Sequence, residues 1–376
     1  MTLHKHLAGF AITALAAAIP AAAMADISIY GRAHVSVDLL DDGNKYSEAN
    51  LSSNSSRLGF KGSHEINPNL KAFFQIEQEI LFSSEGDSKF NTRDTFVGLG
   101  GDFGSIQAGR FDSPFKVARG PANLFGDQVG DMRNLTRVSD SRFDERYDNT
   151  LQYTTPNFSG FNAKLAYSMH QGGSASDDHD SKSYSLSLNY AGGPLEASLA
   201  YENAEDDTRN RTRRNLVIEG TNVVEQTTVT PVGDRNGIRF AAAYKVTDAV
   251  KVVGFYQTVE SDSKNLTKVQ QDQLSADTYG LGAEFKVGPN TALKGMWLTR
   301  DVDADKRDSD MWVVGVEHKL DKAVRVYANY AVLDNDRDIG LTPWAQGRSA
   351  APGAAQGVNA NGEKASALSV GLRYDF

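Results

Sequence analysis

The sequence predicts an all-β fold, a transmembrane antiparallel β-barrel of sixteen strands. Long stretches alternate strictly between apolar and polar residues, and the connections between them alternate between short and long. After residue 25, no apolar stretch is long enough to cross a bilayer as a helix. The mean hydropathy is −0.43, which suits a membrane barrel because its lumen-facing residues are polar. A soluble sandwich or lipocalin-like barrel would not need strands of about ten or more residues throughout.

The first 25 residues, "MTLHKHLAGFAITALAAAIPAAAMA", have the pattern of a secretory signal peptide. Lys5 precedes an apolar run from Leu7 to Ile19, and the triplet at 23–25 supplies an A-x-A cleavage site. A buried amino-terminal helix would need amphipathic periodicity, which this alanine-rich run lacks. We therefore expect cleavage of residues 1–25 and a mature chain, residues 26–376, outside the cytoplasm.

The mature chain is expected to form one domain, because no Pro-rich, Ser-rich or charged linker divides it. The 376 residues have a net charge of −9, and the signal peptide holds one lysine and no acidic residue, so its removal gives −10. This acidic balance argues against nucleic acid as a partner. The chain has no cysteine, so disulfides do not stabilise it.

The first mature segment, "DISIYGRAHVSVDL", alternates over more residues than a typical globular strand. Its apolar face holds Ile27, Ile29, Ala33, Val35, Val37 and Leu39. Its polar face holds Ser28, Tyr30, Arg32, His34, Ser36 and Asp38. The same pattern returns in "FNAKLAYSM", "KSYSLSLNY", "PLEASLAY", "GIRFAAAYKV", "YGLGAEFKV", "AVRVYANYAV" and "ALSVGLRYDF". No helical periodicity competes with it.

The connections fall into two classes. Short ones read "INPN", "GGDFG", "PNFSG", "AGGP", "VTDA", "VGPN" and "LDKA", rich in the residues that turns require. Long polar ones cover 40–54, 83–90, 111–147, 171–180, 204–233, 261–274, 302–307 and 334–364. Seven short turns and eight long loops join sixteen strands, and each class occupies one rim of the barrel.

The carboxyl terminus, "GLRYDF", ends an alternating strand on a large apolar ring. We expect this strand to pair with the first, since closure leaves no edge exposed to lipid. Aromatic residues recur near strand ends, as interfacial girdles require. They are Tyr153, Tyr167, Tyr184, Tyr190, Tyr201, Tyr244, Tyr256, Tyr279, Trp297, Trp312, Tyr330, Tyr374 and Phe376.

Four strings resemble the general diffusion porins of Gram-negative outer membranes: "IYGRA" (29–33), "SSRLGFKGS" (55–63), "NTRDTFVGLGGDFGSIQAGR" (91–110) and the closing "LRYDF". The similarity spans the mature chain. It implies a water-filled outer-membrane channel that passes small hydrophilic solutes and ions passively, without catalysis or a cofactor. It also implies a homotrimer, contact with outer-membrane lipid and lipopolysaccharide, and a terminal signal, here Tyr374 and Phe376, for the barrel-assembly machinery.

In that family the third loop folds inward and forms a constriction. Here the third loop is 111–147, which contains "GPANLFGDQVGD". Its length and its glycines, Gly126 and Gly130, suit a loop with a compact structure of its own. An outward-facing loop is the alternative.

Family porins set basic wall residues opposite acidic residues of this loop, and the motifs place the wall residues here at Arg32, Arg57, Arg93 and Arg146. The alternation independently puts Arg32 and Arg57 on the lumen-facing side.

The facing of Arg93 depends on the strand that follows it. Lipid-facing Val97 and Leu99 would turn Arg93 outward, whereas lipid-facing Phe96 and Gly98 would turn it inward. We favour the second arrangement because charge on the lipid face is costly.

The acidic side of the constriction departs from the family. Its "PEFG" string is "ANLFG" here, so the expected glutamate is absent and the candidates are Asp127 and Asp131. Four arginines against fewer acids predict a preference for anions. This preference should not depend on titration of the arginines, because arginine charge does not titrate. Other acidic residues expected to face the lumen counteract this preference: Asp38, Glu77, Glu79, Glu196, Glu202 and Glu284.

Two alternative functions stay open. The four arginines could serve a substrate-selective channel for phosphate or an organic anion. A plugged outer-membrane barrel enzyme would need a nucleophile, or an acid and histidine constellation, at one rim. The string "RNRTRR" (209–214) is either a solvated surface or a contact for lipopolysaccharide phosphates or other anions. The histidines of the mature chain show no ligand spacing, so no metal is implied.

Overall fold

The computed structural model describes residues 26–82, 90–137, 143–169, 182–205, 211–219, 222–230, 234–263, 266–346 and 361–376. The expected signal peptide, 1–25, lies outside the described residues. The strands are β1 (Asp26–Asp41), β2 (Ser47–Ser53), β3 (Arg57–Asn67), β4 (Leu70–Ile80), β5 (Phe90–Thr92), β6 (Thr95–Gly101), β7 (Gly104–Asp112), β8 (Arg146–Thr154), β9 (Phe161–Ser168), β10 (Ser183–Gly192), β11 (Leu195–Ala204), β12 (Arg211–Glu219), β13 (Asn222–Thr230), β14 (Arg235–Lys245), β15 (Val250–Ser261), β16 (Ala276–Lys286), β17 (Thr291–Val302), β18 (Ser309–Lys319), β19 (Val324–Asn335) and β20 (Lys364–Asp375). The helices are α1 (Pro114–Val117), the 3-10 helix η2 (Gly120–Ala122), α2 (Arg133–Thr136) and α3 (Lys268–Leu274).

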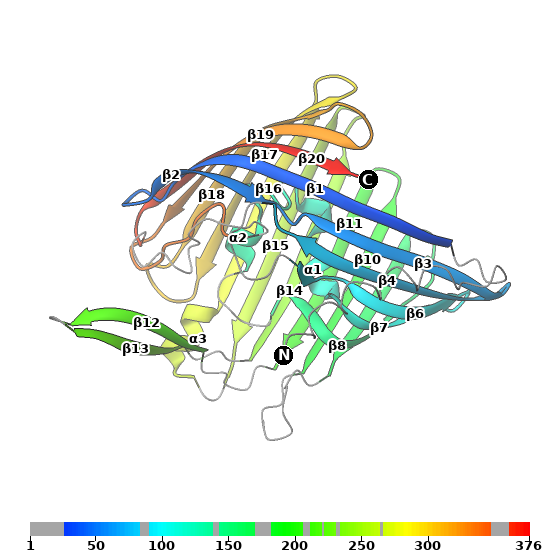
Figure 1. The fold of residues 1–376 in the computed structure, drawn as a ribbon, viewed down its shortest axis with the longest axis horizontal. Coiled ribbons are helices and arrows are strands. Elements are labelled where there is room, and N and C mark those ends of the chain that lie inside the picture. The colour runs from blue at the N-terminus through cyan, green and yellow to red at the C-terminus, as the bar shows by residue number, and fades with distance from the viewer. Residues whose placement is uncertain are drawn as a thin grey trace, which may run out of the picture.

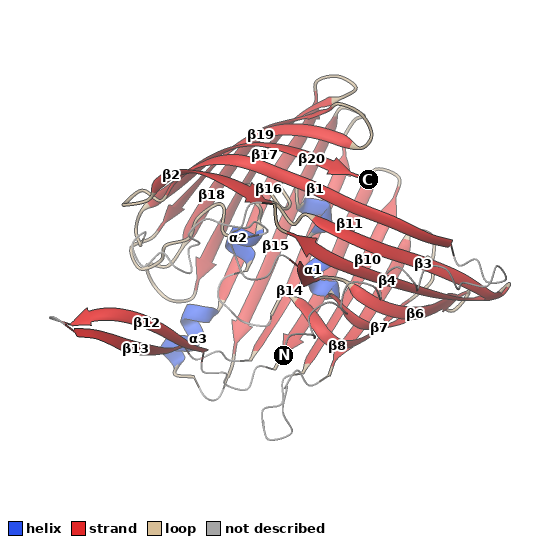
Figure 2. Cartoon of the chain, viewed as in Figure 1, coloured by secondary structure: helices blue, strands red, loops and turns tan. Residues whose placement is uncertain are grey.

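One antiparallel sheet of eighteen strands closes into a barrel (Figures 1 and 2). Two of its spans are interrupted, because β2 and β3 both pair with β1, and β5 and β6 both pair with β4. The barrel therefore has sixteen spans, as the sequence predicted. Strand β1 pairs with β20 from Arg32↔Asp375 to Asp41↔Ser366, so the first and last strands close the sheet.

The two faces of the strands follow the predicted alternation. In β1, His34, Ser36 and Asp38 are buried toward the lumen, whereas Val37 and Leu39 are 55% and 54% exposed on the outside. Apolar side chains are exposed in this way along most spans, because lipid rather than water surrounds the outer wall. The barrel is thus apolar outside and polar inside.

Both rims follow the predicted loop lengths, with three differences inside the long loops. Strands β1 and β2 extend so far that only 42–46 connect them, so a loop over 40–54 was wrong. The segment 204–233 contains the hairpin β12–β13, which projects away from the barrel (Figure 1); the side chains of "RNRTRR" lie outside the described part. Helix α3 was also missed, although its capping box of Thr267 and Gln270 is a recognisable sequence signal. Among the described residues, no helix is long and apolar enough to span a membrane.

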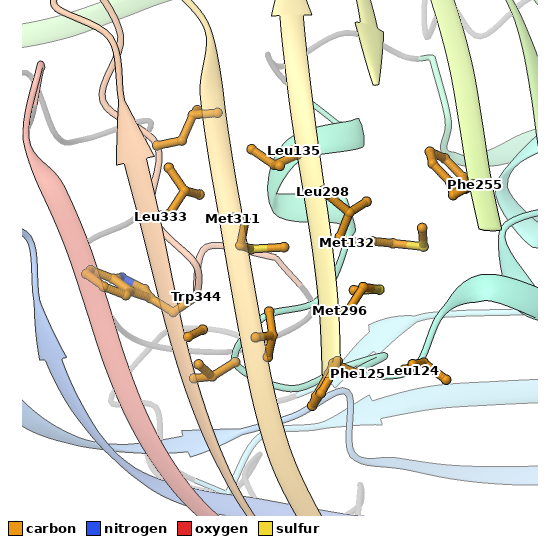
Figure 3. Close-up of a cluster of buried hydrophobic side chains, with 14 of the residues drawn as sticks. Leu124, Phe125, Met132, Leu135, Phe255, Met296, Leu298, Met311, Leu333 and Trp344 are labelled. Atoms are coloured by element: carbon orange, nitrogen blue, oxygen red, sulfur yellow. The ribbon is translucent and has the colours of Figure 1, made fainter. Parts of the chain in front are cut away.

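The third loop folds into the barrel, so the outward alternative is excluded. Its apolar residues pack against lumen-facing residues of β17 and β18, and Trp344 joins them from the last long loop (Figure 3). In this cluster the fully buried loop residues are Phe125, Val129, Met132 and Leu135, which lie against Met296, Leu298, Met311 and Val313. Gly130 has a φ of +83°, and a Cβ there would lie 2.5 Å from Val313, so only glycine permits this close approach.

Candidate functional site

Two arginines meet the tip of the inward loop. Arg32 and Arg57 are register partners on β1 and β3, so their side chains leave the same face of the sheet side by side. Asp127 Oδ2 lies 3.3 Å from Arg32 Nη1 and 3.5 Å from Arg57 Nη2. A single loop carboxylate therefore faces two wall guanidinium groups.

Asp127 is held for this contact by the loop backbone. Its φ is +60°, and its backbone N–H donates to Asp131 Oδ2 at 2.8 Å. Partial burial alone would raise the pKa of Asp127, but Arg57, Arg32 and Arg93 outweigh it and hold that pKa below its usual range. Asp127 thus stays ionised.

Asp131 does not face the open lumen, contrary to the sequence expectation. Its side chain is 1% exposed and accepts the N–H groups of Asp127 and Arg133. Burial raises the pKa of Asp131. Its carboxylate shapes the loop tip, because a short acidic side chain can satisfy nearby backbone donors in place of regular structure.

Arg93 points inward, but the lipid-facing Phe96 and Gly98 from which we expected this were wrong. Val97 and Leu99 face outward, with exposures of 61% and 45%. Gln75 pairs with Phe96 and Gln78 with Thr92, so three steps along β4 correspond to four steps along β5–β6. The extra residue is a β-bulge, which reverses the facing at that point. Arg93 Nε consequently donates to Glu77 Oε1 at 2.6 Å.

Arg146 forms its ion pairs with other carboxylates than the remaining three arginines do. Its guanidinium contacts Asp94 of the same bulge and lies 2.9 Å from Asp112 Oδ1. Asp112 also pairs with Lys116 of α1 at 3.0 Å. Arg146 therefore belongs to a network that ties the start of the loop to the wall, whereas Arg32 and Arg57 meet the loop tip and Arg93 pairs with Glu77 of the wall.

Two arginines that the sequence reasoning did not select are joined to Arg32 through Asp375. Arg373 of β20 and Arg325 of β19 are register partners, and both pair with Asp375, which also pairs with Arg32. The alternation in "GLRYDF" carried the signal for Arg373, because Leu372 and Tyr374 face outward. We call Arg32, Arg57, Arg93, Arg325 and Arg373 the wall cluster.

A second set of contacts attaches the inward loop to the wall, through loop residues other than those at its tip. Arg239 of β14 is fully buried; its Nη1 lies 2.9 Å from Asp144 Oδ1, and its guanidinium covers the Phe115 ring at 4.0 Å. Gln257 of β15 accepts from Arg239 and donates to the Thr136 carbonyl at 3.0 Å. The pKa of Asp144 lies below its usual range, because Arg239 and Arg133 outweigh burial, which alone would raise it.

The terminal Phe376 is seated at the barrel seam. Its backbone exchanges hydrogen bonds of 2.8 and 3.1 Å with Gly31. A Cβ on Gly31 would lie 2.3 Å from the Phe376 ring, so the missing side chain leaves room for the ring. Phe376 also contacts Tyr374, with ring centroids 5.4 Å apart.

A closed sixteen-span barrel with an apolar outside and a charged lumen defines an outer-membrane channel. The chain belongs to the Gram-negative porin family, whose model matches residues 11–338. It is 28% identical over 381 residues to outer membrane porin protein 32 of Delftia acidovorans, which covers 97% of this chain and 98% of the relative. It is 32% identical over 187 residues to major outer membrane protein P.IB of Neisseria sicca, which covers 46% of this chain and 52% of that protein.

Solved porin structures have the same fold. An anion-selective porin from Comamonas acidovorans superimposes with a TM-score of 0.69 at 25% identity, covering 94% of this chain and all of that one. OmpT of Vibrio cholerae, in a trimer form, gives a TM-score of 0.66 at 19% identity, covering 94% and 99%. The protein is a channel of the Gram-negative outer membrane for passive diffusion of small hydrophilic solutes and ions. Its relatives are porins, which are channels rather than enzymes.

Proposed function

We propose that the loop over 111–147 narrows the pore, with Arg32, Arg57, Arg93, Arg146 and Asp127 at the constriction, and that the channel leans toward anions. One observation supports the anion preference. The wall cluster and Lys294 form a continuous set of ion pairs with only four carboxylates of the described residues, Glu77, Asp127, Glu317 and Asp375. Six cations against four acids give this set of paired groups an excess of two positive charges, which raises the local concentration of anions.

General diffusion is favoured over a selective phosphate or organic-anion channel. Each arginine of the wall cluster already pairs with a carboxylate, so its fork is not open for bidentate capture of one substrate. Weak contacts along a charged wall let ions leave as readily as they enter. The relative from Comamonas acidovorans, described as anion-selective, supports the sign of this preference.

We also infer the partners of the protein and its processing. The Vibrio cholerae structure in a trimer form supports a homotrimer, with outer-membrane lipid and lipopolysaccharide around its apolar wall. Tyr374 and Phe376 serve as the assembly signal, with Phe376 seated at the seam. Residues 1–25 are cleaved on export.

The test is the conductance of refolded protein in a planar bilayer under a KCl gradient. We expect open steps in threes and a reversal potential displaced toward that of chloride. The double variant Arg32→Gln, Arg57→Gln should move the reversal potential toward that of potassium, whereas Arg337→Gln, at a site 70% exposed, should not. Block of chloride current by dilute phosphate would favour the selective channel. Replacement of 119–131 by a short Gly-Ser linker should increase the conductance, and unchanged conductance would contradict the constriction.

A further inference from the structure

A small cavity of about 20 Å³ separates the end of the inward loop from the barrel wall. Thr136 and Asp144 line it from the loop, and Thr278 of β16 and Arg300 of β17 line it from the wall. It lies away from the wall cluster, and none of the cluster's residues line it. Nothing in the proposed constriction therefore accounts for it.

The wall side of the cavity is a row of cross-strand neighbours. Gln257 pairs in register with Thr278, and Thr278 pairs with Arg300, so all three side chains leave the lumen face together. The Gln257 amide accepts from Arg239 and donates to the Thr136 carbonyl. The next two positions in the row are Thr278, 1% exposed, and Arg300, 4% exposed.

Buried donors at this cavity lack acceptors. In the part of the chain that the structure describes, no hydrogen bond reaches Arg300 Nη1, Thr278 Oγ1 or Thr136 Oγ1. Buried polar groups are almost always paired with protein or water. Three unpaired donors that belong to residues lining one small cavity therefore indicate an acceptor inside it.

The charge at the cavity indicates that this acceptor is an anion. Arg300 cannot neutralise itself by losing a proton, and a buried, unmatched charge is strongly unfavourable. The charged groups that act on Arg300 are Arg235, Arg307 and Asp308, of which two are cations. Asp144, the carboxylate that lines the cavity, pairs through Oδ1 with Arg239 at 2.9 Å and through Oδ2 with Arg133 at 3.7 Å, although among the described residues Oδ2 accepts no hydrogen bond.

We propose that this cavity binds one small inorganic anion of about chloride size, held by Arg300 with the hydroxyl groups of Thr278 and Thr136. The cavity of about 20 Å³ has room for a single particle near the size of water, since one water needs about 10–15 Å³ of such space. Phosphate and organic anions are too large for it. Because Thr136 belongs to the loop and Arg300 to the wall, the anion fastens the end of the loop to the barrel.

The first experiment compares thermal unfolding of the refolded wild-type porin in sodium chloride and in sodium gluconate at equal ionic strength. A ligand that binds only the folded protein raises Tm in proportion to the logarithm of its concentration once the site is filled. Gluconate is too large for the cavity. The Tm should therefore be higher in chloride than in gluconate, and it should rise as chloride replaces gluconate. Equal Tm values in the two salts would overturn the proposal and leave water as the acceptor.

Two variants and a control assign the effect to the cavity. Arg300→Met should abolish the chloride dependence of Tm, and Thr278→Val should shift it to higher chloride while every charge is kept. Arg337→Gln, an exposed arginine outside the cavity, should retain the wild-type dependence. If Arg300→Met does not fold, Thr278→Val and the wild-type salt comparison still decide.

A direct measurement is anomalous scattering from crystals soaked in bromide. We expect a peak beside Arg300 Nη1 in the wild type and none in Thr278→Val at the same low bromide concentration. Absence of the wild-type peak would contradict the proposal. The reversal potential of Thr278→Val should equal that of the wild type, so this site and the proposed selectivity can fail independently.

Discussion

Arg32 of β1 and Arg57 of β3 lie directly opposite each other in register, and Asp127 reaches both guanidinium groups from the loop tip. Two like charges on adjacent strands repel, so this carboxylate links the loop to the wall and partly offsets that repulsion. The same contact therefore bears on both loop position and ion preference.

Asp127→Asn should strengthen the anion preference and weaken the attachment of the loop tip. The side chains involved are 18–28% exposed, so we expect a loss of only about 1 kcal/mol in the free energy of unfolding. The reversal potential under a KCl gradient should move further toward that of chloride. Asp338→Asn, an exposed site, serves as control, and a move toward potassium would contradict the assignment of Asp127.

The Asp127 ion pairs should survive moderate acid. The pKa of Asp127 is lower in the folded protein than its unfolded value of about 3.9. Its stabilising contribution is therefore complete above that unfolded value and is lost as pH falls through the lower folded value. The Tm difference between wild type and Asp127→Asn should stay constant from pH 7 to about pH 5 and shrink below about pH 4. A difference that already vanishes at pH 5 would contradict the lowered pKa.

Arg239→Met should loosen the far side of the loop. Removal of the guanidinium leaves Asp144 buried without its closest cation, and breaking a buried pair in this way costs about 3–5 kcal/mol. We expect a lower Tm and increased open-channel noise in single-channel records. Arg239→Lys keeps the charge but loses the planar guanidinium that Gln257 binds. Its Tm and its open-channel noise should lie between those of the wild type and of Arg239→Met. Quiet channels in Arg239→Met would show that the loop does not depend on this contact.

Gly31→Ala should impair closure of the barrel. The new Cβ would lie 2.3 Å from the Phe376 ring, and overpacking of this kind costs about 1–3 kcal/mol. The folded fraction after refolding into detergent, read from the heat-dependent shift in gel mobility, should decrease. Gly120→Ala is the matched control, because a Cβ there meets no atom within 4 Å. Equal folded fractions would show that Phe376 can move aside at little cost.

The site could be read from the sequence only where the alternation is unbroken. Arg32 and the neighbouring residues of β1 lie on the face that their position predicts. Arg93 faces inward because of a bulge that the alternation does not reveal. Asp131 is near in sequence to Asp127, yet one carboxylate meets the wall and the other is buried under the loop, because their facing depends on the loop backbone and not on a period.

The sequence by itself determined the barrel, its span number and its two rims. A strand between lipid and a polar lumen must alternate at every second residue, and this local pattern is legible without any distant contact. Only the tertiary structure decided which charges meet. Asp127 reaches Arg32 across 95 residues, and Arg32 reaches Asp375 across 343. Such pairs depend on barrel closure and on the path of the loop inside it, which no local period records.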